Sequence, residues 1–264
     1  MLITSRDNSL LRHARAVRDG KDHELIFVEG LRLSEEALRS GLKIEATIYS
    51  NEIAQKERAA ALLDELHEVC NQVGEVSESL LATVSYTKTP QGIIVLARRP
   101  PAGPELLKTK DKRPHLLVLM EAINNPVNVG AILRSAEAAG ATGIITTANT
   151  SDPFSPKALR GAMGSAFRMP VWSGASYTEA LAWCAKHGIK TVSADVGATV
   201  LHTEIDWKLS RALVVGPEST GLSPEQLRMT DESVKIPMHG NVESLNVGVA
   251  AAVLLYEAAR QRSN

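Results

Sequence analysis

The 264-residue chain is poor in aromatic residues, cysteine and net charge, and each shortage excludes a class of protein. Aromatic residues make up only 4% of the chain, so we expect a mostly aliphatic core. Cys70 and Cys184 stand far apart without CxxC or Cys/His spacing, which argues against a disulfide framework or a zinc site and fits a reducing cytoplasm. The formal net charge of −1 excludes a polycation that binds nucleic acid by bulk charge, so any such surface has to be a local patch.

Long apolar runs are also missing. No run approaches the ~20 residues that a membrane span needs, and the first twenty residues lack the apolar core of a secretory signal. The seven histidines show no HxxxH spacing, so we expect no metal. With 44% hydrophobic and 22% charged residues, the composition is that of an ordinary globular protein.

One break in composition divides the chain. Residues 97–115 combine four prolines with a group of basic residues, which is typical of an exposed linker. This break predicts a domain over residues 1–98, a linker over residues 99–113 and a second domain over residues 114–264.

Strand-like and helical segments alternate in both predicted domains. In the first domain, strands are expected at 24–30, 44–50 and 91–99, with helices at 8–17, 32–41 and 52–70. This order predicts a small α/β layer domain. In the second domain, strands are expected at 115–121, 143–147, 189–195, 211–216 and 233–237, with helices that include 129–140 and 177–188. Apolar strands joined by helices predict a mainly parallel sheet covered by helices on both faces.

Three strands of the second domain run into glycine- and asparagine-rich loops. These loops lie within residues 119–136, 214–223 and 236–246. Ligands of parallel sheets bind outside the carboxyl ends of the strands, so the loops predict one shared site. The last loop carries more polar residues than an N-cap requires before an apolar helix begins.

The loops argue against two common ligands. There is no GxGxxG after the first strand of the second domain, which argues against a dinucleotide and against an oxidoreductase that uses one. The segment GPESTGLS nearly matches a phosphate-binding loop, but Leu222 stands at the lysine position and Glu218 adds an anion. What remains is a ligand that is held largely by backbone groups and carries little negative charge.

The same loops resemble a known family. NPVNVGAILRSAEAAGATGI (125–144), LVVGPESTGLS (213–223) and IPMHGNVESLNVGVAAAVLLYE (236–257) resemble motifs 1, 2 and 3 of the SpoU (TrmH-like) RNA 2′-O-ribose methyltransferases of the SPOUT superfamily. The segment LRGAMGSAFRMPV (159–171) resembles the family's connection between motifs 1 and 2. Residues 1–98, with FVEGLRLSEEAL and TKTPQGIIVLAR, resemble its L30e-like substrate-binding domain.

The resemblance implies an α/β fold whose C-terminal segment forms a deep trefoil knot, a topology that general folding rules would exclude. It also implies S-adenosylmethionine as cofactor, structured RNA as substrate and a homodimer formed through the C-terminal domain. Ribosomal RNA is favoured over transfer RNA because of the L30e-like domain. A non-catalytic RNA-binding or assembly factor remains an alternative, which S-adenosylmethionine binding would exclude.

The resemblance also implies roles for individual residues. The catalytic set is Arg134, Asn128, Glu218, Ser244 and Asn246. The cofactor contacts are Gly216, Ile236 and Leu245, with Thr146, Val215 and Met238 as further pocket candidates. The candidate RNA contacts are Arg160, Arg168, Arg12 and Arg15, and Arg160 and Arg168 could instead contact the partner subunit.

Several of these residues also have a purely structural interpretation. Asn128, Ser244 and Asn246 could simply be residues that begin a helix. Glu218 is expected to hold Arg134 or Asn128 in place. Arg134 lies in an apolar helical segment and is expected to need a partner. The resemblance implies that Arg134 acts on the ribose 2′-hydroxyl, either as a transiently neutral base or as a charged stabiliser of the alkoxide. Sequence does not decide between these roles, because the pKa of arginine lies above about 12.

Overall fold

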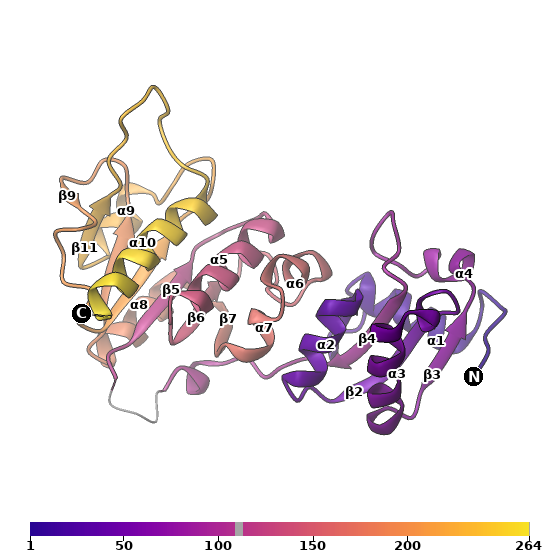
Figure 1. Cartoon of the computed structure of the whole chain (residues 1–264). Helices are drawn as coiled ribbons and strands as arrows, with labels where there is room; N and C mark the ends of the chain where they lie inside the picture. The colour runs from indigo at the N-terminus through magenta and orange to yellow at the C-terminus, as the bar shows by residue number, and fades with distance from the viewer. Residues whose placement is uncertain (109–112, 264) are drawn as a thin grey trace. The chain divides into compact units, whose positions relative to one another are not determined.

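The computed structural model describes residues 1–108 and 113–263, which form two compact units (Figure 1). Unit 1 comprises Met1–Pro100 and Phe154–Arg168, and unit 2 comprises Pro101–Pro153 and Met169–Asn264. The sequence predicts an uninterrupted second domain over 114–264, whereas the packing groups Phe154–Arg168 with unit 1. Local sequence patterns do not predict which unit the segment packs against, because its pattern of short helices is the same in either case.

Unit 1 is built on a four-stranded sheet in the order β1-β4-β2-β3. Strand β4 pairs antiparallel with β1 and β2, whereas β2 and β3 are parallel. Strand β3 is absent from the predicted elements, because four residues, of which only alternate ones are buried, give too short an apolar pattern. The strands are β1 (Leu25–Glu29), β2 (Ile44–Ser50), β3 (Val73–Val76) and β4 (Ile93–Arg98).

Helices pack against this sheet through apolar stripes. In α1 (Ser9–Arg18), Leu10, Leu11, Ala14 and Val17 recur at helical spacing and join the core that lies on the sheet. The segment Phe154–Arg168 contributes α6 (Pro156–Ala162) and α7 (Ser165–Arg168) to the unit. The other helices are α2 (Leu31–Arg39), α3 (Glu57–Val69) and α4 (Glu78–Ala82), with a 3-10 helix η1 (Ile53–Gln55).

Unit 2 contains a seven-stranded sheet in the order β7-β6-β5-β10-β8-β11-β9. Every neighbouring pair is parallel, so the prediction of a mainly parallel sheet is confirmed. The trefoil knot stays a prediction. The strands are β5 (Leu116–Met120), β6 (Gly143–Thr147), β7 (Val171–Ala175), β8 (Lys190–Ala194), β9 (Val200–Leu201), β10 (Arg211–Val215) and β11 (Glu232–Lys235).

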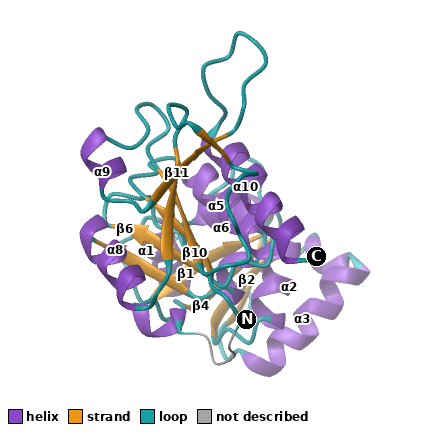
Figure 2. Cartoon of the chain, turned by 90° about the vertical axis from the view of Figure 1, so that its left-hand side faces the viewer, coloured by secondary structure: helices purple, strands orange, loops and turns teal. Residues whose placement is uncertain are grey.

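Helices cover both faces of the second sheet. Helices α5 (Pro126–Ala138) and α10 (Val247–Arg262) lie side by side on one face (Figure 1). Helix α8 (Tyr177–Lys186) packs on the alternate side chains of β5 and β10, such as Leu117, Leu119 and Val214. The short α9 (Pro224–Arg228) precedes β11. Helices and loops around the sheet are distinguished by colour in Figure 2. Among the residues that the structure describes, no helix is both long enough and apolar enough to cross a membrane.

The predicted linker, residues 99–113, is only partly described, because residues 109–112 lie outside the described ranges. Its middle forms the 3-10 helix η2 (Pro104–Leu107), in which Leu107 is buried. The backbone N–H of Gly103 donates to the carbonyl of Val171 on β7 at 3.0 Å. The part of the predicted linker from Gly103 to Leu107 is therefore packed into unit 2.

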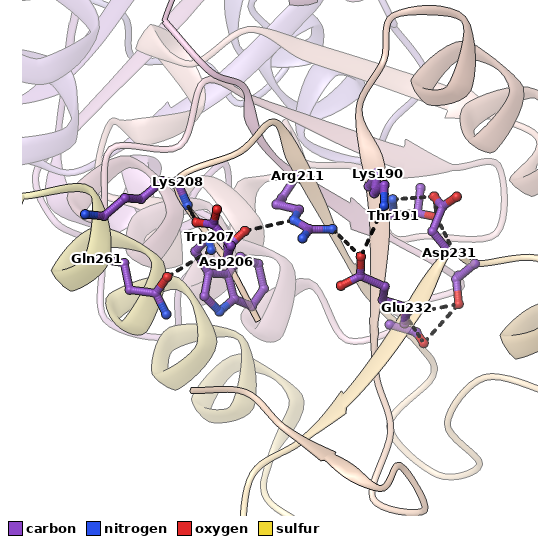
Figure 3. A network of polar contacts seen from close by, with 11 residues as sticks. Lys190, Thr191, Asp206, Trp207, Lys208, Arg211, Asp231, Glu232 and Gln261 are labelled. Atoms are coloured by element: carbon purple, nitrogen blue, oxygen red, sulfur yellow. Dashed lines mark hydrogen bonds and ion pairs between the residues drawn. The ribbon is translucent and has the colours of Figure 1, made fainter. Parts of the chain in front are cut away.

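A polar network joins the amino ends of three strands (Figure 3). The buried Arg211 at the start of β10 donates to the Glu232 carboxylate on β11 at 2.7 Å and to the carbonyl of Asp206 at 3.0 Å. Gln261 of α10 accepts from the backbone N–H of Trp207 at 2.9 Å. These contacts fasten the end of α10 to the edge of the sheet opposite to the strand ends that carry the polar loops.

Candidate active site

The carboxyl ends of β10, β8 and β11 border a cavity of about 320 Å³. Five of the six predicted cofactor contacts line it: Gly216, Ile236, Leu245, Val215 and Met238. The catalytic candidates Glu218 and Ser244 line it as well. Thr146 does not, because it lies buried on β6, two strands away from β10 in the sheet. The loops after β10 and β11 that the sequence singled out therefore border the cavity, whereas no residue of the loop after β5, which the structure describes in full, lines it.

Gly216 allows one wall of the cavity to fold tightly. A Cβ atom at this position would lie 2.7 Å from the backbone nitrogen of Leu222. The loop 217–222 can thus turn back against the end of β10 only because residue 216 has no side chain. The wall this makes exposes backbone groups to the cavity, which suits a ligand that is recognised by hydrogen bonds to the main chain.

The charges on the cavity wall favour a cationic ligand. Asp195, Glu218 and Glu243 contribute carboxylates, and Lys235 contributes an ammonium group. Such a balance is unfavourable for a polyphosphate and favourable for a sulfonium or amino group. Asp195 and Glu243 are absent from the predicted site; the position of Asp195 directly after a buried strand is the signal that would have found it.

A chain of side-chain hydrogen bonds ties the three loops together at Asn128. The buried Asn128 amide donates to Glu218 Oε1 at 2.9 Å and accepts from Asn246 Nδ2 at 3.2 Å. Asn246 in turn caps α10 by accepting from the N–H of Gly248 at 2.9 Å. Asn128 is not the cap of its own helix, because Asn125 fills that position. Glu218 therefore holds Asn128, and the N-cap interpretation is wrong for Asn128 but correct for Asn246.

Arg134 lies on the exposed side of α5. The helix buries positions 128–130, 132, 133 and 136, so residue 134 points to the opposite side. Arg134 forms no hydrogen bond or ion pair with any residue in 1–108 or 113–263. The expectation that it needs an internal partner is wrong, because its guanidinium group is not enclosed by the apolar residues beside it in sequence. Arg134 is therefore exposed on the helix that also carries Asn128, and it is available to a substrate.

A second link between the loops was not predicted. The buried Glu121, which follows β5, accepts from Gln226 Nε2 of α9 at 3.0 Å. Gln226 also completes the capping box of α9 with Ser223. Burial, together with the nearby Glu121 carboxylate, raises the pKa of Tyr177 to about 12. Ala122, next in sequence, has a φ of 49°, which an alanine seldom adopts.

Together, Glu121–Gln226 and Asn128–Glu218 brace segment 121–128 against segment 218–226 at two points. The two segments are the loop after β5 and the loop after β10, so the braces fix one wall of the cavity relative to the start of α5. Among the residues that the structure describes, no three metal-ligating side chains come together.

The predicted RNA contacts all lie in unit 1. Arg12 and Arg160 are exposed. Arg15 donates to the carbonyl of Arg6 at 2.8 Å, and Arg168 forms an ion pair with Glu36 of α2. Within the described residues, Arg12 and Arg160 are thus the arginines of this set whose side chains make no hydrogen bond or ion pair with the protein.

Comparison with known sequences gives matches over both units. Residues 115–256 match the SpoU rRNA methylase family, and residues 11–95 match the MRM3-like substrate binding domain. The chain is similar to the 23S rRNA (guanosine(2553)-2′-O)-methyltransferase RlmP of Bacillus subtilis (strain 168). The two are 34% identical over 232 residues, which cover 87% of this chain and 86% of RlmP.

Solved structures agree with these matches. A crystal structure of an RNA 2′-O ribose methyltransferase has a TM-score of 0.84 and 33% identity, covering 100% of both chains. The SpoU methyltransferase AviRb from Streptomyces viridochromogenes, in complex with the cofactor AdoMet (S-adenosylmethionine), has a TM-score of 0.85 and 26% identity. That alignment covers 97% of this chain and 99% of AviRb.

Proposed function

This chain belongs to the SpoU rRNA methylase family, and we propose that it transfers a methyl group from S-adenosylmethionine to a ribose 2′-hydroxyl of ribosomal RNA. The observation that carries the proposal is the Glu218–Asn128–Asn246 chain, which links the three loops beside a cavity lined by the loops after β10 and β11. Ribosomal RNA is favoured over transfer RNA because RlmP, by its name, acts on 23S ribosomal RNA.

The residues that line the cavity suit S-adenosylmethionine in polarity and in charge. Gly216, Ile236 and Leu245, supported by Val215 and Met238, would hold its adenosine through backbone groups and apolar contacts. Glu218, Glu243 and Asp195 give the wall a negative balance that suits a cationic ligand. When bound, the cofactor supplies an electrophilic methyl group on its sulfonium.

Arg134, Ser244 and the residues hydrogen-bonded to Asn128 position the ribose and stabilise the charge that develops on it. Arg134 hydrogen-bonds the ribose 2′-oxygen and stabilises the negative charge that develops there, since a guanidinium group offers five donors and no acceptor. Asn128, Glu218 and Asn246 fix the starts of α5 and α10 relative to the cavity. Ser244, at the cavity wall, positions the ribose. The proton of the hydroxyl passes to water or to a phosphate oxygen.

In this proposal, one unit recognises the RNA and the other binds the cofactor and transfers the methyl group. Unit 1, which contains the MRM3-like substrate binding match, recognises RNA, with Arg12, Arg15, Arg160 and Arg168 as contacts. Unit 2 binds the cofactor within a trefoil knot and forms a homodimer through α10. The buried free cysteines and the ribosomal RNA substrate favour the cytoplasm as the compartment.

Cofactor binding separates this enzyme from a non-catalytic RNA-binding factor. Isothermal calorimetry with S-adenosylmethionine is expected to show binding to the wild type and its loss in Gly216→Val, because the added side chain meets the backbone of Leu222. Gly240→Ala is the control, since a Cβ at Gly240 meets nothing within 4 Å. A folded wild-type chain that binds no S-adenosylmethionine would leave the RNA-binding factor as the better account.

A further inference from the structure

A buried carboxylate in unit 1 holds the base of an exposed loop. Glu29, at the end of β1, is 5% exposed and accepts four hydrogen bonds from residues 85–87. Its Oε1 accepts from the hydroxyls of Ser85 and Thr87, and its Oε2 accepts from the N–H groups of Tyr86 and Thr87. Burying a carboxylate is unfavourable unless donors replace water, and here all four donors belong to the loop.

Arg18 anchors the same loop from the other side. Its Nη1 donates to the carbonyls of Thr83, Val84 and Ser85 at 3.4, 3.0 and 3.3 Å. Arg18 belongs to the last turn of α1, the helix that also carries Arg12 and Arg15. The two anchors thus fix the loop and tie it to the basic helix.

The residues beyond these anchors face solvent. The ring of Tyr86 is 42% exposed, and Lys88, Thr89 and Gln91 are exposed as well. Neither the Tyr86 hydroxyl nor the Lys88 ammonium has a hydrogen-bond partner within the described part of the chain. Residues 83–91 contain no carboxylate, and aromatic residues are scarce in this chain. The loop is held rigidly at its base, yet its aromatic ring and its cation both face solvent. The ring is therefore not part of the hydrophobic core, and the cation is not neutralised by a carboxylate of the loop.

We propose that the loop 83–91 binds an unpaired segment of the RNA substrate, with Tyr86 stacked on a base and Lys88 on a phosphate. Unpaired bases expose the π-faces that aromatic side chains stack on, and a neighbouring cation follows the backbone. Glu29 and Arg18 are positioning residues in this arrangement, because they hold the loop from beneath. The inference rests on the proposed function for the identity of the RNA.

The test measures RNA binding separately from methyl transfer. The full chain is titrated with an unmodified 23S ribosomal RNA transcript in filter-binding assays at several salt concentrations. Tyr86→Ala is expected to weaken binding about tenfold, within the range for one stacked base, whereas Tyr86→Phe keeps the ring and stays near wild type. Lys88→Ala is expected to weaken binding and to reduce the salt slope by about one phosphate contact. Lys56→Ala, an exposed lysine on another part of unit 1, is the control.

The outcomes distinguish this proposal from the proposed function. Unchanged affinity and salt slope in Tyr86→Ala and Lys88→Ala, with wild-type melting temperatures, would overturn the loop as an RNA contact. Weakened binding in both variants supports it, whether or not methyl groups are transferred. Absence of transfer by a wild-type chain that binds the transcript would instead contradict the proposed function and leave the loop assignment standing.

Discussion

At the scale of single residues, Asn128 and Arg134 show how one helix performs two tasks. Asn128 is buried and has both ends of its amide engaged, by Glu218 and by Asn246. Arg134, six positions later, lies on a solvent-facing side of α5. The buried side of α5 therefore fixes the geometry of the loops through Asn128, and its exposed side presents Arg134 to the substrate.

Arg134→Ala is expected to lower methyl transfer by at least about 100-fold, the lower end of the range for losing a donor that stabilises a developing oxyanion. S-adenosylmethionine affinity should stay unchanged, because Gly216, Ile236 and Leu245 are untouched. Arg134→Lys should fail nearly as badly, since an ammonium lacks the planar fork of donors. Single-turnover transfer at saturating RNA, with calorimetry in parallel, measures both quantities.

The control for this pair is Arg228→Ala, which removes an exposed helical arginine that pairs with Glu225 at the surface. Exposed ion pairs contribute little to stability, so this variant should match the wild type. Near-normal transfer by Arg134→Ala, or a parallel loss of cofactor binding, would show that Arg134 has a different role.

At the scale of elements, the two braces between the loops after β5 and β10 determine the cavity wall. If the Glu121–Gln226 pair acts by positioning, Glu121→Ala should lower kcat and raise the KM for S-adenosylmethionine. The exchange Glu121→Gln with Gln226→Glu keeps one carboxylate facing one amide and should restore most of the loss. Steady-state kinetics of the two single variants and the exchange variant test the coupling. Additive losses in the exchange variant would exclude it.

The end of α10 carries a pH-dependent contribution to stability. Hydrogen bonds from Arg260, reinforced by one from Gln261, lower the pKa of Glu257 from 4.5 to about 2. Because the folded pKa is depressed, this contribution is fully present above pH 4.5 and is lost as the pH falls toward 2. Urea unfolding at several pH values should show a shallower decline over that range in Glu257→Gln than in the wild type. Equal slopes would mean that another carboxylate causes the acid sensitivity.

Helices and strands were predictable from the sequence where burial produces a long run of apolar residues. Strand β5 is apolar throughout and β10 is apolar after Arg211, because both faces of the sheet are covered. The two-residue β9 and the edge strand β3 have too few residues to show a pattern. The loops of the site were predictable because each follows a segment that the sequence predicts as a strand. The Glu121–Gln226 brace was not, since its residues lie 105 positions apart and only the fold brings them together.

At the scale of the whole molecule, α10 leaves an apolar stripe uncovered. Val249 and Tyr256 are 50% and 56% exposed and lie two turns apart on one side of the helix. We expect a second copy of the chain to cover this stripe. Sedimentation should find a dimer at micromolar concentration, and Tyr256→Arg should shift it toward monomer, whereas Leu209→Arg, at another exposed apolar position, should not. An active wild-type monomer at that concentration would contradict the dimer.

The most direct test of the central claim is the chemical position of the transferred methyl group. The purified chain is incubated with isotopically labelled S-adenosylmethionine and unmodified ribosomal RNA, and the RNA is digested to nucleosides for mass spectrometry. We predict a single 2′-O-methylnucleoside that carries the label, and its absence when Arg134→Ala replaces the wild type. A label on a base, or no label in RNA that the chain demonstrably binds, would contradict the assignment as a ribose methyltransferase.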